Sequence, residues 1–324
     1  MKSLSGSLAA PFPYFGGKSL ACATVWAALG DTANYVEPFA GSASMLLGAQ
    51  AGKRVETIND ADGFVANFWR AVAADADAVV EAIDWPCNEA DLFARHSWLV
   101  RNAADLLARL HADPYYYDAK IAGWWCWGVC NWIGSGWCSG TGPWVHDGER
   151  LVNGRKLPHL GDAGQGINRK LPHLSAGQGA RRAFIGEWFA ALMARMRDVR
   201  VACGDWTRVL AESVTTRHGL TGVFLDPPYT LGEMDYAVGG VGGALANEVR
   251  EWCKRNGSNR MLRIVLCGHA GEHDALLANG WHLRTWKARK GYAHTDAALE
   301  NSESETLWCS PHCVPEVAIQ GGLF

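Results

Sequence analysis

The sequence lacks the features of a secreted or membrane-inserted chain. Its first thirty residues contain Gly, Pro and aromatic residues where a leader would have a basic start and an unbroken apolar run. No later stretch reaches the roughly 18 uncharged apolar residues of a membrane span. The ten cysteines are scattered and lack the regular spacing of a disulfide framework, which favours reduced thiols. We therefore expect a soluble, cytoplasmic protein with no membrane partner.

The chain also lacks an overall charge excess, because its formal net charge is −3. Nucleic-acid binding must then come from a local patch. Residues 148–182 form such a patch, with seven cations against two acids. The cations are Arg150, Arg155, Lys156, Arg169, Lys170, Arg181 and Arg182. Interleaved glycines let this segment follow a phosphate backbone, and we expect salt-dependent binding to double-stranded DNA. Residues 155–166 recur, one residue shorter, at 169–179, so the alternative is a solvated loop that grew by duplication.

Predicted strands and helices alternate in the parts of the chain before and after its middle segment, as in an α/β fold. Residues 34–37 predict a strand, 38–42 a tight turn, 44–51 a helix and 54–60 a second strand, followed by one helix over 61–83. From Trp85 to about Arg182 this alternation is absent, although a helix is expected at 91–112 within that stretch. The alternation returns with a helix at 183–197. Further strands are expected at 199–203, 222–225, 263–267, 282–286 and 305–308, with a helix at 243–255. The simplest interpretation is one α/β domain, 11–84 and 183–312, interrupted by an inserted module at 85–182.

The inserted module is rich in tryptophan and cysteine. Its tryptophans either form a small core or stack on DNA, and we favour the core. Cys126, Cys130, Cys138 and His146 offer zinc ligands, but the Cys-x3-Cys spacing is loose, and buried thiols are the better interpretation. Cys309, His312 and Cys313 are similarly ambiguous. We expect no metal site.

The strongest chemical signal is the segment Asp226-Pro227-Pro228-Tyr229 after an apolar strand. The two prolines fix an extended turn and remove two N–H donors, which leaves carbonyl groups free to accept hydrogen bonds beside the Asp. Such a pocket suits a planar group with an exocyclic amine, with Asp226 and a carbonyl as acceptors and Tyr229 stacked on the ring. The alternative is a plain turn that ends a strand.

A second signal follows the first predicted strand. Glu37 ends that strand and Gly41 allows close backbone approach, so a ligand can lie at the carboxyl edge of the sheet. The segment lacks the three-glycine dinucleotide fingerprint, and an acid there would repel a pyrophosphate, which disfavours a nicotinamide-dependent dehydrogenase. A cofactor with a cationic amino-acid part fits better. Asp60, which ends the next strand, is placed to bind ribose hydroxyls, unless it only caps the helix that begins near Asp62.

Together with 13–18 (Pro-Tyr-Phe-Gly-Gly-Lys) and 204–206 (Gly-Asp-Trp), these segments resemble the D12 class of DNA adenine-N6 methyltransferases, the Dam-like enzymes. The resemblance covers about residues 11–80 and 183–310, with the motifs in the family's order. It implies a Rossmann-like methyltransferase sheet, S-adenosylmethionine as cofactor and a target-recognition insertion. The middle of the chain does not look like the recognition domain of Dam itself, so the target sequence stays open.

The resemblance also implies roles for single residues. Glu37 and Asp60 would contact the methionine amino group and the ribose hydroxyls, Asp205 would face the cofactor adenine, and residues 15–18 would close over the cofactor. The full expected cofactor set is Tyr14, Phe15, Gly16, Gly17, Lys18, Glu37, Phe39, Gly41, Asp60, Asp205 and Trp206. Residues 226–229 would hold the target base, which must be flipped out of the duplex.

Several alternatives remain open on the residues alone. The same pocket logic allows N4 methylation of cytosine, and related Asn-Pro-Pro-Tyr pockets methylate glutamine amides in proteins, although the basic insert argues against a protein substrate. A DNA-binding module with an idle methyltransferase site is a further alternative, which the intact acids at 37, 60, 205 and 226 disfavour. A restriction endonuclease encoded nearby is a partner that the resemblance leaves open.

Overall fold

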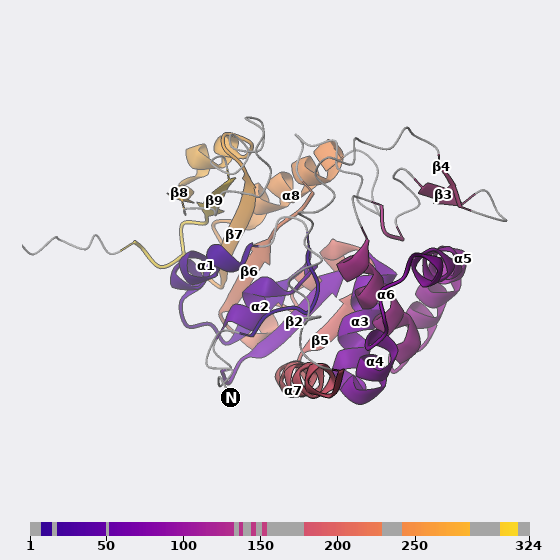
Figure 1. The fold of residues 1–324 in the computed structure, drawn as a ribbon. Coiled ribbons are helices and arrows are strands. Elements are labelled where there is room, and N and C mark those ends of the chain that lie inside the picture. The colour runs from indigo at the N-terminus through magenta and orange to yellow at the C-terminus, as the bar shows by residue number, and fades with distance from the viewer. Residues whose placement is uncertain are drawn as a thin grey trace, which may run out of the picture.

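The centre of the molecule is a seven-stranded sheet (Figure 1). The structure, a computed structural model, describes residues 8–14, 18–49, 52–132, 136–138, 144–146, 151–153, 178–228, 242–285 and 305–316. The strand order is β5-β2-β1-β6-β7-β9-β8, and β9 is antiparallel to both of its neighbours while the other pairings are parallel. The strands are β1 (Asn34–Glu37), β2 (Val55–Asp60), β5 (Arg200–Cys203), β6 (Thr221–Leu225), β7 (Leu262–His269), β8 (His282–Thr285) and β9 (Glu305–Cys309). The predicted α/β, Rossmann-like sheet is confirmed.

The order of the strands creates a switch point between β1 and β6. From β1 the chain continues outward to β2 and β5 on one side, and it later returns to β6 and β7 on the other. In open sheets of this type, ligands bind in the crevice at the carboxyl ends of the strands on either side of such a point. Glu37 is the last residue of β1, and Asp226 directly follows the last residue of β6. The two acids therefore lie where a ligand site is expected.

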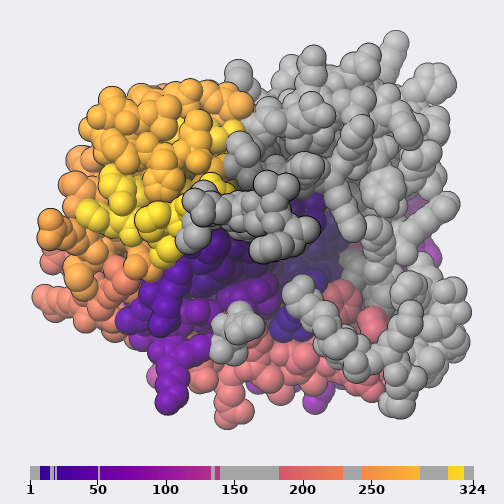
Figure 2. Space-filling view, turned by 90° about the vertical axis from the view of Figure 1, so that its left-hand side faces the viewer, coloured from indigo at the N-terminus to yellow at the C-terminus, as the bar shows by residue number. Residues whose placement is uncertain are grey.

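Both faces of the sheet are covered, and the strands alternate between them. Tyr35 and Phe224 belong to one buried cluster, whereas Val36, Val223 and Leu225 belong to the other. This period of two is the normal side-chain pattern of a strand. The first cluster is completed by α1 (Cys22–Leu29), α2 (Ser44–Gly48), α3 (Gly63–Ala74) and α7 (Gln178–Met196), and the second by α8 (Gly242–Asn256). From the side of α1, the indigo N-terminal residues lie between the yellow and orange C-terminal residues and the salmon residues on the other side (Figure 2).

Two predicted helices differ from those observed. The single helix expected over 61–83 is two helices, α3 and α4 (Ala76–Ile83). Asp75 interrupts them because its side chain accepts a hydrogen bond from the amide of Ala78 and so caps α4, while its own amide still donates to Ala71. The helix expected over 44–51 ends at Gly48, after which the backbone of Ala49 is extended.

Much of the expected module packs directly on the α/β layer. It contains α5 (Glu89–Ala112), α6 (Ala119–Asn131) and a small hairpin of β3 (Trp144–His146) and β4 (Leu151–Asn153). Asp118 caps α6, and its backbone exchanges two hydrogen bonds with the side chain of Asn67 on α3, at 2.8 and 2.9 Å. The limits of the module, 85–182, stay a prediction, but α6 shares its core with α3 and α4.

Most of the described tryptophans and thiols of α6 and of the segment after it are buried. Trp125, Trp127 and Trp132 are buried, as expected for core residues. Cys126, Cys130 and Cys138 are also buried, which confirms the interpretation as buried thiols, and burial raises the pKa of Cys126 and Cys138 well above its usual value. Within the described ranges no group of three or more His, Cys, Asp and Glu side chains is arranged to hold a metal ion. None of the helices in the described part combines the length and the apolar character needed to cross a bilayer.

Candidate active site

The Asp226 segment lies at the carboxyl end of β6, where a buried lysine meets it. Lys18 Nζ lies 3.6 Å from Asp226 Oδ1, and the two side chains are 3% and 21% exposed. Pro227 is buried and Pro228 is half-buried. Their rings restrict the backbone angle φ, so the conformation of the turn after Asp226 is restricted. Tyr229, the expected stacking partner, lies outside the described residues. Asp226 therefore borders solvent while one of its oxygens is already oriented by a cation.

Lys18 was expected to close over the cofactor, together with Phe15, Gly16 and Gly17, which lie outside the described residues. The structure places its ammonium group against Asp226, which is 208 positions away along the chain, and its role at the cofactor stays a prediction. No local sequence pattern indicates this pair. It joins the N-terminal segment and β6 in one site.

Glu37, at the end of β1, is almost fully buried, at 2% exposure. One of its oxygens accepts a hydrogen bond from Tyr35 Oη at 3.0 Å, and the amide of Leu46 in α2 donates to the same carboxyl group. Burial raises the pKa of Glu37 to about 8, against these hydrogen bonds, and the charge of Asp226 adds to the increase. Glu37 and Asp226 are thus electrostatic neighbours across the switch point.

The loop after Glu37 has a tight backbone. Gly41 has a φ of +46° and Ala43 a φ of +50°, both in the left-handed region. The amide of Gly41 donates to Asp60 Oδ2 at 2.8 Å, and its carbonyl accepts from Trp69 Nε1 at 2.9 Å. The ring of Tyr14 lies directly over it, because a Cβ on residue 41 would be 2.3 Å from Tyr14 Cε1. Only glycine fits this position without displacing a neighbour.

We expect Gly41→Ala to destabilise the folded chain by about 1–3 kcal/mol and to weaken cofactor binding, because the new methyl group meets Tyr14 in a strained backbone. Denaturant unfolding without cofactor measures the first effect. Gly186→Ala on α7 is the matched control, since a Cβ there meets nothing within 4 Å, and it should stabilise the helix by about 0.5–1 kcal/mol. Recovery of stability in Gly41→Ala with Tyr14→Ala would locate the clash. Equal destabilisation with and without Tyr14 would show that this contact is irrelevant.

Asp60 forms hydrogen bonds with the loop after β1 and with the residues before α3. Its Oδ2 accepts from Gly41 and its Oδ1 from the amide of Asp62 at 2.9 Å, and burial raises its pKa against these bonds. The helix cap that was the alternative role for Asp60 belongs to Asp62, which accepts from the amide of Phe64 at 2.8 Å. The side chain of Asn59 donates to Pro38 O and Gly204 O, at 3.0 and 2.9 Å, and so connects the ends of β1, β2 and β5.

Asp205 and Trp206 follow β5 at the same edge. Asp205 is exposed, and its Oδ1 accepts from the amide of Thr207 at 2.9 Å and from the hydroxyl of Thr207, so it caps a short 3-10 helix. Trp206 is buried and packs on Phe39, with ring centroids 5.8 Å apart. The rings of Trp206 and Phe39 thus pack together at the carboxyl edge of the sheet, whereas Asp205 is exposed to solvent.

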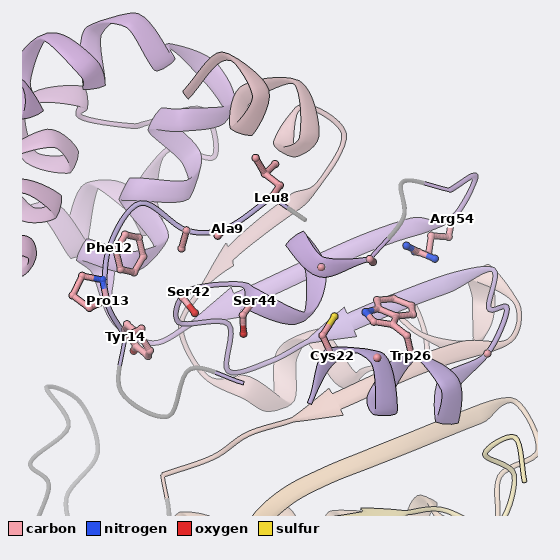
Figure 3. Close-up of a pocket in the computed structure, with 15 residues that line it drawn as sticks. Leu8, Ala9, Phe12, Pro13, Tyr14, Cys22, Trp26, Ser42, Ser44 and Arg54 are labelled. Atoms are coloured by element: carbon pink, nitrogen blue, oxygen red, sulfur yellow. The ribbon is translucent and has the colours of Figure 1, made fainter. Parts of the chain in front are cut away.

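A groove of about 740 Å³ runs beside the site, between α1 and α2 (Figure 3). Tyr14, Ser42 and Ser44 lie toward one end and Arg54 toward the other, where its guanidinium lies over the Trp26 ring. Of the expected cofactor residues that the structure describes, only Tyr14 lines this groove. The groove is therefore a neighbour of the carboxyl edge and does not coincide with it.

The expected DNA-binding residues are described only in part. Arg155, Lys156, Arg169 and Lys170 lie outside the described residues. Arg181 lies in the first turns of α7, where only the backbone is described, and Arg182 is exposed on the same helix.

Comparison with known proteins finds a match to one protein family. Residues 14–111 match the model of a family described as D12 class N6 adenine-specific DNA methyltransferase. No curated protein matches the chain. The match includes Tyr14, Lys18, Glu37, Gly41 and Asp60, while Asp226 lies beyond it. Residues 14–111 are thus similar to the D12 class of N6 adenine-specific DNA methyltransferases, a family of S-adenosylmethionine-dependent enzymes, and the seven-stranded sheet around them agrees with that similarity.

Proposed function

We propose that the chain transfers the methyl group of S-adenosylmethionine to N6 of an adenine that has been flipped out of a specific site in double-stranded DNA. The observation that carries the proposal is the meeting of Glu37 and Asp226 at the carboxyl ends of β1 and β6. Glu37 and Asp60 suit the cationic amino group and the ribose hydroxyls of this cofactor, because carboxylates are acceptors for both. Asp226 then faces the other reactant.

When bound, S-adenosylmethionine supplies an electrophilic methyl group on a sulfonium centre. The N6 lone pair of adenine is delocalised into the ring, so the attacking nitrogen must become more pyramidal. Asp226 accepts an N6–H hydrogen bond and a carbonyl of the proline pair accepts the other, which favours that change and aligns the nitrogen. Lys18 positions the Asp226 carboxylate before the base arrives.

The remaining parts of the proposal concern DNA. Arg155, Lys156, Arg169, Lys170, Arg181 and Arg182 contact phosphate groups, and Tyr229 stacks on the flipped base and offsets part of the unstacking cost of a few kcal/mol. The segment 85–182 serves as the recognition module.

Nucleoside mass spectrometry tests the reaction. DNA is incubated with the protein and S-adenosylmethionine that carries a deuterated methyl group, digested to nucleosides and analysed. The proposal predicts labelled N6-methyladenine. Labelled N4-methylcytosine would show that the same pocket accepts a different amine, label in protein would show a glutamine-type substrate, and cofactor binding without any transfer would indicate an idle site. Each of these three outcomes contradicts the proposal.

Cofactor binding should also be linked to a proton. With a pKa of about 8, Glu37 is mostly protonated at neutral pH, and a cationic amino group beside it favours the ionised form. Binding therefore releases about one proton, and between about pH 6 and 7.5 the affinity should rise about tenfold per pH unit. Calorimetry in buffers of different ionisation enthalpy measures the proton. Glu37→Gln should remove the pH dependence, and a wild-type affinity that is constant over this range would argue against the role of Glu37.

A further inference from the structure

A second concave surface lies between α4, α5 and α6. These three helices lie away from the switch point between β1 and β6 (Figure 1). Its volume is about 830 Å³. Trp85 lines it after the end of α4, Arg95 and Trp98 from α5, and Lys120 and Trp124 from the start of α6. We call this surface the tryptophan groove. None of its lining residues belongs to the site described above.

Arg95 is the unusual member of the tryptophan groove. The centre of its guanidinium lies 4.3 Å from the ring centroid of Trp127, 5.0 Å from that of Trp124 and 5.3 Å from that of Trp85. Arg95 is only 7% exposed, and within the described part of the chain its Nη1 has no hydrogen-bond partner. Indole faces attract a cation but accept no strong hydrogen bond. Burial lowers the pKa of Arg95, and the charge of Asp91 partly opposes this effect. The buried Nη1 still has no acceptor among the described residues, and such an atom favours an added anionic oxygen.

Other charges in the tryptophan groove favour an anion. Lys120 is exposed, and its Nζ lies 4.4 Å from the ring centroid of Trp124 and 5.0 Å from that of Trp98. Arg101 also lines the groove, against the acids Glu81 and Asp91. The Asp91 carboxylate is held by Trp85 Nε1 and Asn88 Nδ2, at 2.5 and 2.6 Å, so its acceptor capacity is partly used. The lining therefore has three cations against two acids.

We propose that the tryptophan groove binds a nucleotide, with its phosphate against Arg95 and Lys120 and its base on the indole of Trp85. Trp85 is 47% exposed and so keeps ring surface available for stacking. Grooves that combine cations with aromatic side chains bind unpaired nucleotides in this way. A free nucleotide and an unpaired nucleotide in a single strand offer the same chemistry. The inference concerns a site separate from methyl transfer and does not depend on it.

Calorimetric titration of the full chain tests the groove, with thymidine monophosphate as one probe and single-stranded oligothymidylate as the other. Arg95→Met should lower the association constant by about tenfold or more, because a charge-assisted hydrogen bond is lost. Lys120→Met, at an exposed position that does not endanger the fold, should lower it by about threefold and reduce its salt dependence. Arg109→Met, exposed on α5 outside the groove, is the matched control and should leave binding unchanged.

The two probes distinguish the sources. Binding of both indicates a free nucleotide as a sufficient ligand, and binding of the oligomer alone indicates a strand. An oligomer with abasic sites tests the base, and it should bind more weakly than oligothymidylate. Photo-crosslinking of an oligomer that contains 5-iodouracil should yield an adduct on Trp85. Equal binding by wild type, Arg95→Met and Lys120→Met, equal binding of the abasic oligomer, or adducts confined to other segments would overturn the proposal, whether or not the chain methylates DNA.

Discussion

Replacing Asp226 with Ala is expected to lower kcat for methyl transfer by about 10²- to 10³-fold while changing the cofactor dissociation constant less than about threefold. The reason is that Asp226 directly follows β6, is partly exposed and forms an ion pair with Lys18. The proposed cofactor acceptors, Glu37 and Asp60, are at the ends of the other strands β1 and β2. The variant loses the acceptor that draws the N6 amine toward pyramidal geometry and retains the residues that hold the cofactor. Single-turnover kinetics at saturating cofactor, with calorimetry for affinity, measure the two effects separately.

Two further variants separate chemistry from architecture. Asp226→Asn keeps the shape and one acceptor oxygen, so its loss of rate should be smaller than that of Asp226→Ala. Lys18→Met removes the ion pair but leaves the carboxylate, and its loss should also be smaller. If Asp226→Ala turned over as fast as wild type, the proposed role of this carboxylate would be wrong. If Lys18→Met reproduced the full loss, Asp226 would act only through its pairing with Lys18.

Asp60→Ala should have the opposite signature, with the cofactor dissociation constant raised about 10- to 100-fold and kcat at saturating cofactor nearly unchanged. The Asp60 carboxylate accepts backbone hydrogen bonds from Gly41, Asp62 and Ala61, and its two oxygens retain acceptor capacity for a ribose hydroxyl. The variant also leaves the amides of Gly41 and Asp62 without their acceptor, which should cost about 1–3 kcal/mol of folding stability.

Calorimetric titration with S-adenosylmethionine and denaturant unfolding measure these two effects. Asp205→Ala is the comparison, because that carboxylate is exposed and caps a short 3-10 helix. It should cost less stability than Asp60→Ala. An unchanged affinity in Asp60→Ala, with a reduced kcat, would move Asp60 out of the cofactor site.

The strands that end in the site could be predicted from the sequence because local signals limit them. The predicted limits of 34–37 agree with β1, since Pro38 follows the terminal acid, and the strand at 222–225 is extended by a single residue. The turn at 38–42 also needed glycine for a local reason, the positive φ of Gly41. The limits of these strands and of the turn depend on residues nearby in the chain, and a sequence pattern can therefore predict them.

The features that the prediction missed depend partly on unused local cap signals and partly on partners that are distant in the chain. Helix α6 is rich in Trp, Gly and Cys, which are weak helix formers, and it is stabilised by packing on α3 and α4 and by the bonds between Asp118 and Asn67. A cap signal at Asp118, three residues before Ile121, was present and could have located its start. The break at Asp75 had a similar signal. The pairing of Lys18 with Asp226 had none, because only the fold brings the two segments together.

The structure of a ternary complex with a non-reactive cofactor analogue and methylatable duplex DNA is the most direct test of the account. The proposed mechanism predicts one adenine outside the helix, with its exocyclic nitrogen within about 3.2 Å of Asp226 and facing the sulfonium position of the analogue. An adenine that stays stacked in the duplex, or an extruded base whose amine is bound away from Asp226, would contradict it.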